Sequence, residues 1–112
     1  MGDAVSEYQI ESIWLEFECW PGPYDEYDAN SDVQFRLSDG TEWIATFFTY
    51  RNISTICERN KVTDNCLGGL YFCATDMILI ERLNRESVLL VIEQMMKDDE
   101  ISAFCTQVRD NQ

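Results

Sequence analysis

The chain has 112 residues, among them 21 Asp and Glu, eight Lys and Arg and no histidine, which gives a formal net charge of −13. Hydrophobic residues make up 46% of it, too many for a disordered acidic tail, so we expect one folded domain over residues 1–112. The lack of histidine excludes Ser-His-Asp catalysis, Cys-His catalysis and His-ligated zinc, and the negative charge disfavours direct binding to nucleic acids and anionic membranes.

The first predicted element is a strand over residues 8–20, because its hydrophobic side chains alternate with polar ones. Both faces of this strand carry large aromatic residues, with Phe17 on one and Trp14 on the other. The Pro-Gly-Pro sequence at residues 21–23 ends the strand, because proline has no amide N–H to donate. Residues 24–32 then form an acidic, aromatic loop.

A β-hairpin follows this loop. Residues 33–37 alternate again, and Asp39 and Gly40 suit the left-handed conformations of a tight turn. Residues 41–50 form the return strand, whose many bulky apolar side chains favour a place in the core.

The middle of the chain predicts a short helix from about Asn52, which can cap it, to near Asn60. Residues 63–69 form a loop. Two short strands, residues 70–74 and 77–81, are expected to pair across a turn.

A second, longer helix is expected from Asn84, a good N-cap residue, to Lys97. Val88 and Ile92 lie on one face at helical spacing. Residues 101–108 predict a last strand. The whole order of elements predicts an α+β fold, with a mainly antiparallel sheet of five to six strands and two helices packed on one side of it.

The five cysteines are odd in number and contain no Cys-x-x-Cys pair, which favours reduced thiols over a disulfide framework. The first basic residue is Arg36, and the longest uncharged apolar runs are too short to span a bilayer. We therefore expect a soluble, cytoplasmic protein.

The strongest candidate site is the segment of residues 20–32, because residues 1–32 carry nine acidic side chains and no basic one. Rigid aromatic rings supply contact area, and carboxylates pair with Arg or Lys across an interface. The candidate partner-binding residues are Trp20, Tyr24, Asp25, Glu26, Tyr27, Asp28 and Asp32. The alternative is a solvated loop whose tyrosines cover the edge of the sheet.

Catalysis and metal binding have weaker support. Asp25, Glu26 and Asp28 lack the glycine and the distal glutamate of a helix-loop-helix calcium site, so no metal and no cofactor is predicted. Glu16 and Glu18 form an acidic pair, but such pairs arise by chance among 21 acids. We therefore predict that the protein is not an enzyme.

Four short stretches carry a resemblance to a known class of proteins: SDGTEW at residues 38–43, TFFTY at 46–50, GLYF at 69–72 and DMI at 76–78. In them the chain resembles small bacterial immunity proteins of contact-dependent growth inhibition and other polymorphic toxin systems. The resemblance implies a protein that binds the C-terminal domain of one cognate toxin, often a nuclease, inside the producing cell.

The charge leads to the same hypothesis independently. The active-site cleft of a nuclease is usually basic, and an acidic inhibitor is steered towards it. We therefore predict a stoichiometric binding protein that neutralises a cognate toxin by docking an acidic surface on its basic active-site region. The alternatives are an acidic adaptor or regulatory protein, and a nucleic-acid mimic that binds a different basic protein.

Overall fold

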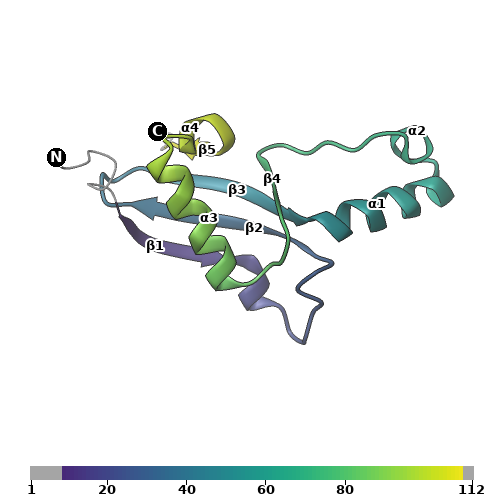
Figure 1. Ribbon diagram of the computed structural model, residues 1–112, viewed down its shortest axis with the longest axis horizontal. Helices are drawn as coiled ribbons and strands as arrows, with labels where there is room; N and C mark the ends of the chain where they lie inside the picture. The colour runs from purple at the N-terminus through teal and green to yellow at the C-terminus, as the bar shows by residue number, and fades with distance from the viewer. Residues whose placement is uncertain (1–8, 110–112) are drawn as a thin grey trace.

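A five-stranded, mainly antiparallel sheet forms the centre of the structure (Figure 1). The structure is a computed structural model, and it describes residues 9–109. The elements in chain order are β1 (Ile10–Leu15), the 3₁₀-helix η2 (Glu16–Cys19), β2 (Asn30–Leu37), β3 (Glu42–Thr49), α1 (Tyr50–Thr63), α2 (Cys66–Gly69), β4 (Met77–Ile80), α3 (Arg85–Lys97), α4 (Ile101–Phe104) and β5 (Thr106–Val108).

The strand order is β1-β2-β3-β4, with β5 also paired to β3. The β1–β2, β2–β3 and β3–β5 pairs are antiparallel, whereas β3 and β4 are parallel. β4 and β5 share one edge of β3, because β4 pairs with Thr46–Thr49 and β5 pairs with Glu42–Ile44. The opposite edge of the sheet is β1.

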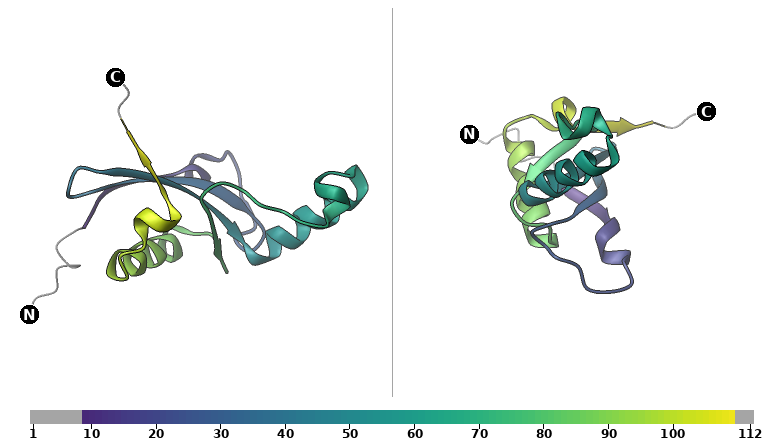
Figure 2. Two further views of the ribbon diagram at one scale, coloured as in Figure 1. Left: turned by 90° about the horizontal axis from the view of Figure 1, so that it is seen from above. Right: turned by 90° about the vertical axis from the view of Figure 1, so that its right-hand side faces the viewer.

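Helix α3 covers one face of the sheet, and α4 lies on the same side (Figure 2). Val88 and Ile92 of α3 are fully buried, and they belong to the same hydrophobic cluster as Val33, Phe35 and Phe47 of the sheet. Burial of each such side chain contributes about 1.5–3 kcal/mol to the free energy of unfolding. The core therefore lies between α3 and this inner face of the sheet.

Several sequence predictions are confirmed. The fold is α+β, and Gly40 occupies the hairpin turn with a φ of 90°. The Asn84 side chain accepts a hydrogen bond from Ser87 N, which caps α3, and α3 ends at Lys97 as expected. These elements depend on short-range signals in the sequence.

Helix α1 takes a different place from the one predicted. It begins directly after β3, is capped by the Thr49 side chain rather than by Asn52, and extends beyond the end of the sheet instead of packing on its face (Figure 1). Its buried side chains are Asn52, Ile56 and Asn60, of which only Ile56 is apolar, so the helix has no wide apolar stripe to lay on a sheet. Residues 70–76 run back beside it, and we call residues 50–76 the arm.

Three strand predictions are also corrected. The first strand ends at Leu15, where Phe17 N donates to Ser31 Oγ and the chain turns into η2. Residues 70–74 form no strand; Phe72 instead packs edge-on against Phe48 of β3, with ring centroids 5.4 Å apart. Residues 101–104 form α4, so only the last three residues of the predicted strand, β5, join the sheet.

The tip of the arm is a tight left-handed turn at α2. Cys66 and Leu67 have φ values of 52° and 54°, which cost energy for residues with a side chain. Gly69 is required there, because a Cβ atom at this position would lie 2.5 Å from the carbonyl oxygen of Cys57. The turn packs α2 against α1 at the far end of the arm.

Candidate protein-binding surface

Two of the three aromatic residues of the predicted site, Trp20 and Tyr24, point into the fold. The Trp20 and Tyr24 rings meet edge-on with centroids 5.2 Å apart, and both pack against the hydrophobic cluster beside Phe17. The Tyr24 hydroxyl donates to Leu83 O at 2.9 Å. Burial, with a smaller effect of the Glu26 charge, raises the pKa of Tyr24. Both rings therefore close one end of the core.

Glu26 ties the same loop to the start of α3. Its Oε1 accepts hydrogen bonds from Arg82 Nε at 2.9 Å and Asn84 Nδ2 at 3.1 Å, and its backbone oxygen accepts from Leu83 N at 2.7 Å. The hydrogen bond from Arg82 is the main cause of a lowered Glu26 pKa, and that from Asn84 adds to it. This carboxylate already has a cationic partner within its own chain.

Asp28 ties the loop to α1. Its two carboxylate oxygens accept from Asn52 Nδ2 and Thr55 Oγ1, each at 2.9 Å, and these two hydrogen bonds lower the Asp28 pKa. Asn52 Oδ1 in turn accepts from Asn30 Nδ2 at 2.8 Å. The base of the arm is therefore anchored through a chain of side-chain hydrogen bonds.

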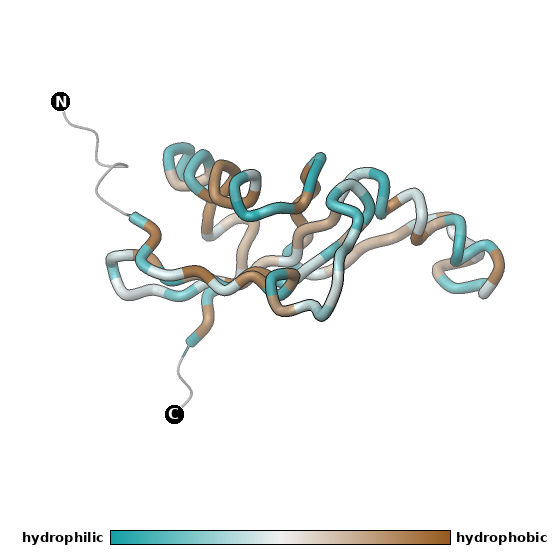
Figure 3. The backbone as a smooth tube through the Cα atoms, turned by 90° about the horizontal axis from the view of Figure 1, so that it is seen from below, coloured by the Kyte–Doolittle hydropathy of each residue, from teal (hydrophilic) through white to brown (hydrophobic). Residues whose placement is uncertain are grey.

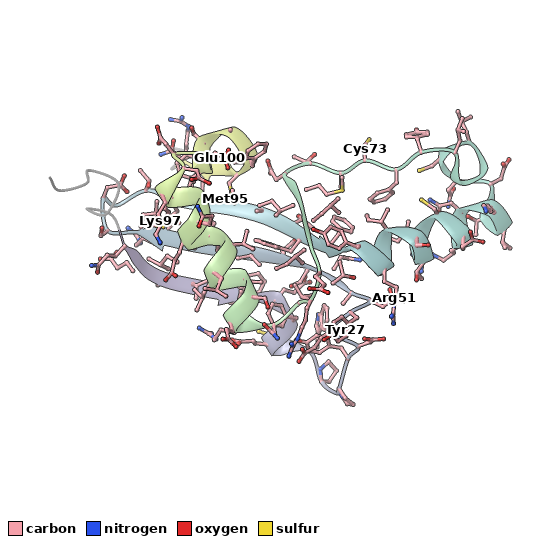
Figure 4. The ribbon with its side chains drawn as sticks, viewed as in Figure 1. Tyr27, Arg51, Cys73, Met95, Lys97 and Glu100 are labelled. Atoms are coloured by element: carbon pink, nitrogen blue, oxygen red, sulfur yellow. The ribbon has the colours of Figure 1, made fainter. Side chains whose placement is uncertain are left out.

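Asp25, Tyr27 and Asp32 are the more exposed of the seven predicted residues. Tyr27, labelled in Figure 4, is 42% exposed. The Arg82 guanidinium lies 5.7 Å from its ring centroid. Asp25 lies 3.9 Å from Arg51, a long and solvent-exposed ion pair. Asp32 is on β2, where it accepts a hydrogen bond from Thr46 Oγ1 at 3.0 Å, so the structure places it on the sheet and the other six in or beside the loop.

The face of the sheet opposite α3, which we call the outer face, presents a second candidate surface. Strand pairing places Trp14, Gln34, Ile44 and Thr106 in one row across β1, β2, β3 and β5. Trp14 is 48% exposed and Ile44 is half-buried. Within residues 9–109, α3 and α4 both lie on the other side of the sheet (Figures 2 and 3). This row therefore faces solvent.

Charged side chains border the row on both sides. On one side, Asp32 lies next to Glu16, whose Oε1 accepts from Asp32 N at 3.0 Å. On the other side, Arg36 pairs with Glu42 at 2.6 Å and lies 3.9 Å from Glu11. A shallow depression of about 320 Å³ beside Trp14 is lined in part by Gln34, Arg36 and Glu42. Four carboxylates and one guanidinium thus border the row, whose apolar members are Trp14 and Ile44.

Sequence reasoning placed Trp14 on the side of the first strand opposite Phe17 but did not assign it to a binding site. The available signal was a tryptophan at an outward position of a strand whose inward positions were already apolar. Only the register of the sheet shows that Ile44 from β3 lies in the same row.

A larger groove of about 870 Å³ lies between β1 and α3. Its apolar lining includes Ile10, Ile13 and Met96, and its charged lining combines acidic with basic side chains, including Arg85 and Lys97. Arg85 is engaged in a bidentate contact with Glu18 at 2.6 and 2.8 Å, and this hydrogen bonding lowers the Glu18 pKa. The groove therefore has no dominant charge that selects a ligand.

The described residues offer little support for a metal site, a reactive thiol or a membrane-spanning helix. Over residues 9–109, no three Asp, Glu or Cys side chains gather as metal ligands, and no helix is long and apolar enough to cross a membrane. All five cysteines lie in this range as free thiols. Burial, with a smaller effect of Asp76, raises the pKa of the Cys105 thiol to about 11, so this cysteine is a poor nucleophile.

Comparison of the chain with models of protein families, with curated proteins and with solved structures gives no match.

Proposed function

We propose that the protein is a stoichiometric binding protein that neutralises a cognate bacterial toxin, a basic nuclease domain, in the cytoplasm of the producing cell. The observation that carries this proposal is where the charge lies. The arm, residues 50–76, holds three basic and three acidic side chains, whereas the rest of the chain holds five basic and 18 acidic ones. The entire net charge of −13 therefore lies outside the arm, and the described residues 9–49 and 77–109 carry −10 of it.

This distribution suits an inhibitor of a nuclease. A nuclease needs a basic cleft to hold phosphates, so an acidic body is steered towards that cleft and can occupy it. Ion pairs of Glu18 with Arg85, of Glu26 with Arg82 and of Glu42 with Arg36 occupy three of the five basic side chains outside the arm. Most of the remaining carboxylates are therefore left for a cationic partner.

The test starts from the gene directly upstream: if it encodes a large secreted protein, the C-terminal domain of that protein is co-expressed with the present one. We expect cells that produce this domain to grow only when the present protein is co-produced, and the two proteins to co-purify in a 1:1 ratio. We also expect the association rate to fall about tenfold or more between 0.05 and 0.5 M salt, because the attraction is screened.

A matched pair of charge variants sharpens the test. Asp25→Asn combined with Asp32→Asn removes two exposed carboxylates of the predicted site and should slow association several-fold. Glu58→Gln combined with Asp64→Asn removes two from the arm and should leave the rate almost unchanged. Failure to protect cells from the toxin would contradict the proposal, and binding to several unrelated basic proteins would indicate a nucleic-acid mimic instead.

A further inference from the structure

We propose that the outer face of the sheet, with Trp14 at its centre, is the surface on which the basic protein partner docks. This inference rests on the proposed function and names the contact surface for it. The partner presents Arg or Lys side chains around a small apolar patch, the chemistry that complements an indole ring bordered by carboxylates.

The first argument is that Trp14 has no role in the core. Trp20 and Trp43 both pack against the hydrophobic cluster, and the Trp43 indole N–H donates to Thr41 Oγ1 at 2.9 Å. Trp14 lies on the opposite face and is 48% exposed. Tryptophan is the residue type most enriched at the energetic centre of protein interfaces, where its large rigid ring loses little entropy on binding.

The second argument concerns the size of the surface. With about 3.3 Å per residue and about 4.8 Å between strands, the four-strand row and its neighbours offer about 300 Å². A stable interface buries about 800 Å² on each partner. The partner must therefore also contact the acidic borders of the face, including Asp32, a residue of the predicted site, and Glu42.

The third argument is charge complementarity. The borders hold Glu11, Glu16, Asp32 and Glu42 against the single cation Arg36, whose guanidinium is already paired with Glu42. A partner guanidinium that stacks on the Trp14 ring would have a carboxylate nearby on either side. Such a cation–π contact gains strength when the interface excludes water.

The tip of the arm is the main competing apolar surface. Leu67 and Leu70 are 73% and 77% exposed there, and Tyr71 is 51% exposed. The arm as a whole carries no net charge, so it lacks the complementarity that a basic partner requires. Its exposed aromatic residue supplies a matched control for Trp14.

The experiment compares Trp14→Ala with Tyr71→Ala in binding to the toxin domain encoded upstream. We expect Trp14→Ala to weaken binding about 30-fold or more, as for a central interface tryptophan, and Tyr71→Ala to change it less than about threefold.

A second pair of variants, Gln34→Lys in the row and Gln94→Lys on α3, adds one positive charge to each side of the molecule. Only Gln34→Lys should weaken binding, and its effect should shrink at high salt.

The outcomes separate this inference from the proposed function. If the toxin domain binds and Trp14→Ala binds equally well, the docking surface is wrong while the function stands. If no toxin domain binds, the function is wrong, and a short arginine-rich peptide then serves as the probe of the surface. Titration of the ¹⁵N-labelled protein with this peptide should shift the Trp14 indole N–H resonance before that of Trp20; unshifted Trp14 signals would overturn the inference.

Discussion

The loop of residues 20–29 and the outer face of the sheet both combine aromatic rings with carboxylates, but they use them differently. In the loop, Trp20 and Tyr24 close the core, and Glu26 accepts hydrogen bonds from Arg82 and Asn84, just before α3. On the outer face, Trp14 projects into solvent from a strand whose inner side is already buried. Both clusters have a similar composition. Whether the backbone directs their side chains into the core or into solvent decides whether a cluster stabilises the fold or remains available to a partner.

The contrast has a simple physical origin. The loop crosses from η2 to β2 beside the start of α3, where side chains can reach Leu83 O and the Arg82 guanidinium. Phe72 covers Phe48 at one end of the outer face. The row around Trp14 has no such cover within residues 9–109, and Asp32 beside it forms its hydrogen bond along the sheet, with Thr46. Substitutions of the inward-pointing loop residues Trp20 and Tyr24 should therefore alter stability, and substitutions on the face should alter binding.

The largest expected difference is between two tryptophans. Trp20→Ala should lower the free energy of unfolding by about 2–3 kcal/mol, somewhat less than for a fully buried ring because Trp20 is partly exposed. Trp14→Ala should lower it by about 1 kcal/mol or less, because nearly half of the side chain is already in water. Urea denaturation followed by circular dichroism measures both. Equal losses for the two variants would contradict the assignment of separate roles.

A smaller effect is expected when only a hydroxyl is removed. Tyr24→Phe deletes the hydrogen bond to Leu83 O and should cost about 1 kcal/mol of unfolding free energy. Tyr27→Phe is the matched control in the same loop, because the Tyr27 hydroxyl makes no hydrogen bond to any residue between 9 and 109. The control should unfold at the same urea concentration as the original protein. A clear loss in the control would show that the loop packs differently.

The elements that short-range signals define could be predicted from the sequence. Asn84 caps α3, and Asp39 and Gly40 form the hairpin turn, because each acts on backbone atoms within four residues. The arm could not be predicted in the same way. The pattern of α1 shows a weak apolar face, but the sequence does not reveal that Phe72 returns to cover Phe48.

The residues of the candidate site could be predicted from the sequence, but the directions in which their side chains point could not. Glu26 meets Arg82 across 56 residues and Asp28 meets Asn52 across 24 residues of sequence. Such long-range partners decide whether a carboxylate already has a hydrogen-bond or ion-pair partner within the chain, and no local pattern encodes them. The row of the outer face likewise joins Trp14 to Ile44 only through the register of three strands.

The smallest expected effect concerns acid sensitivity of the loop. Hydrogen bonds from Asn52 and Thr55 hold the pKa of Asp28 below its ordinary value of 3.8 in the folded protein. A lowered folded-state pKa stabilises the protein above the unfolded pKa, and this stability is lost as the pH falls through the folded value.

Asp28→Asn should therefore cost about 0.5 kcal/mol at pH 6, a small amount because the carboxylate is near solvent. The difference from the original protein should shrink as the pH falls below about 3.8, because Asp28 is then increasingly protonated in both states. Urea denaturation at pH 6 and pH 3 measures this change, and a pH-independent difference would mean that the ionised carboxylate does not anchor the arm.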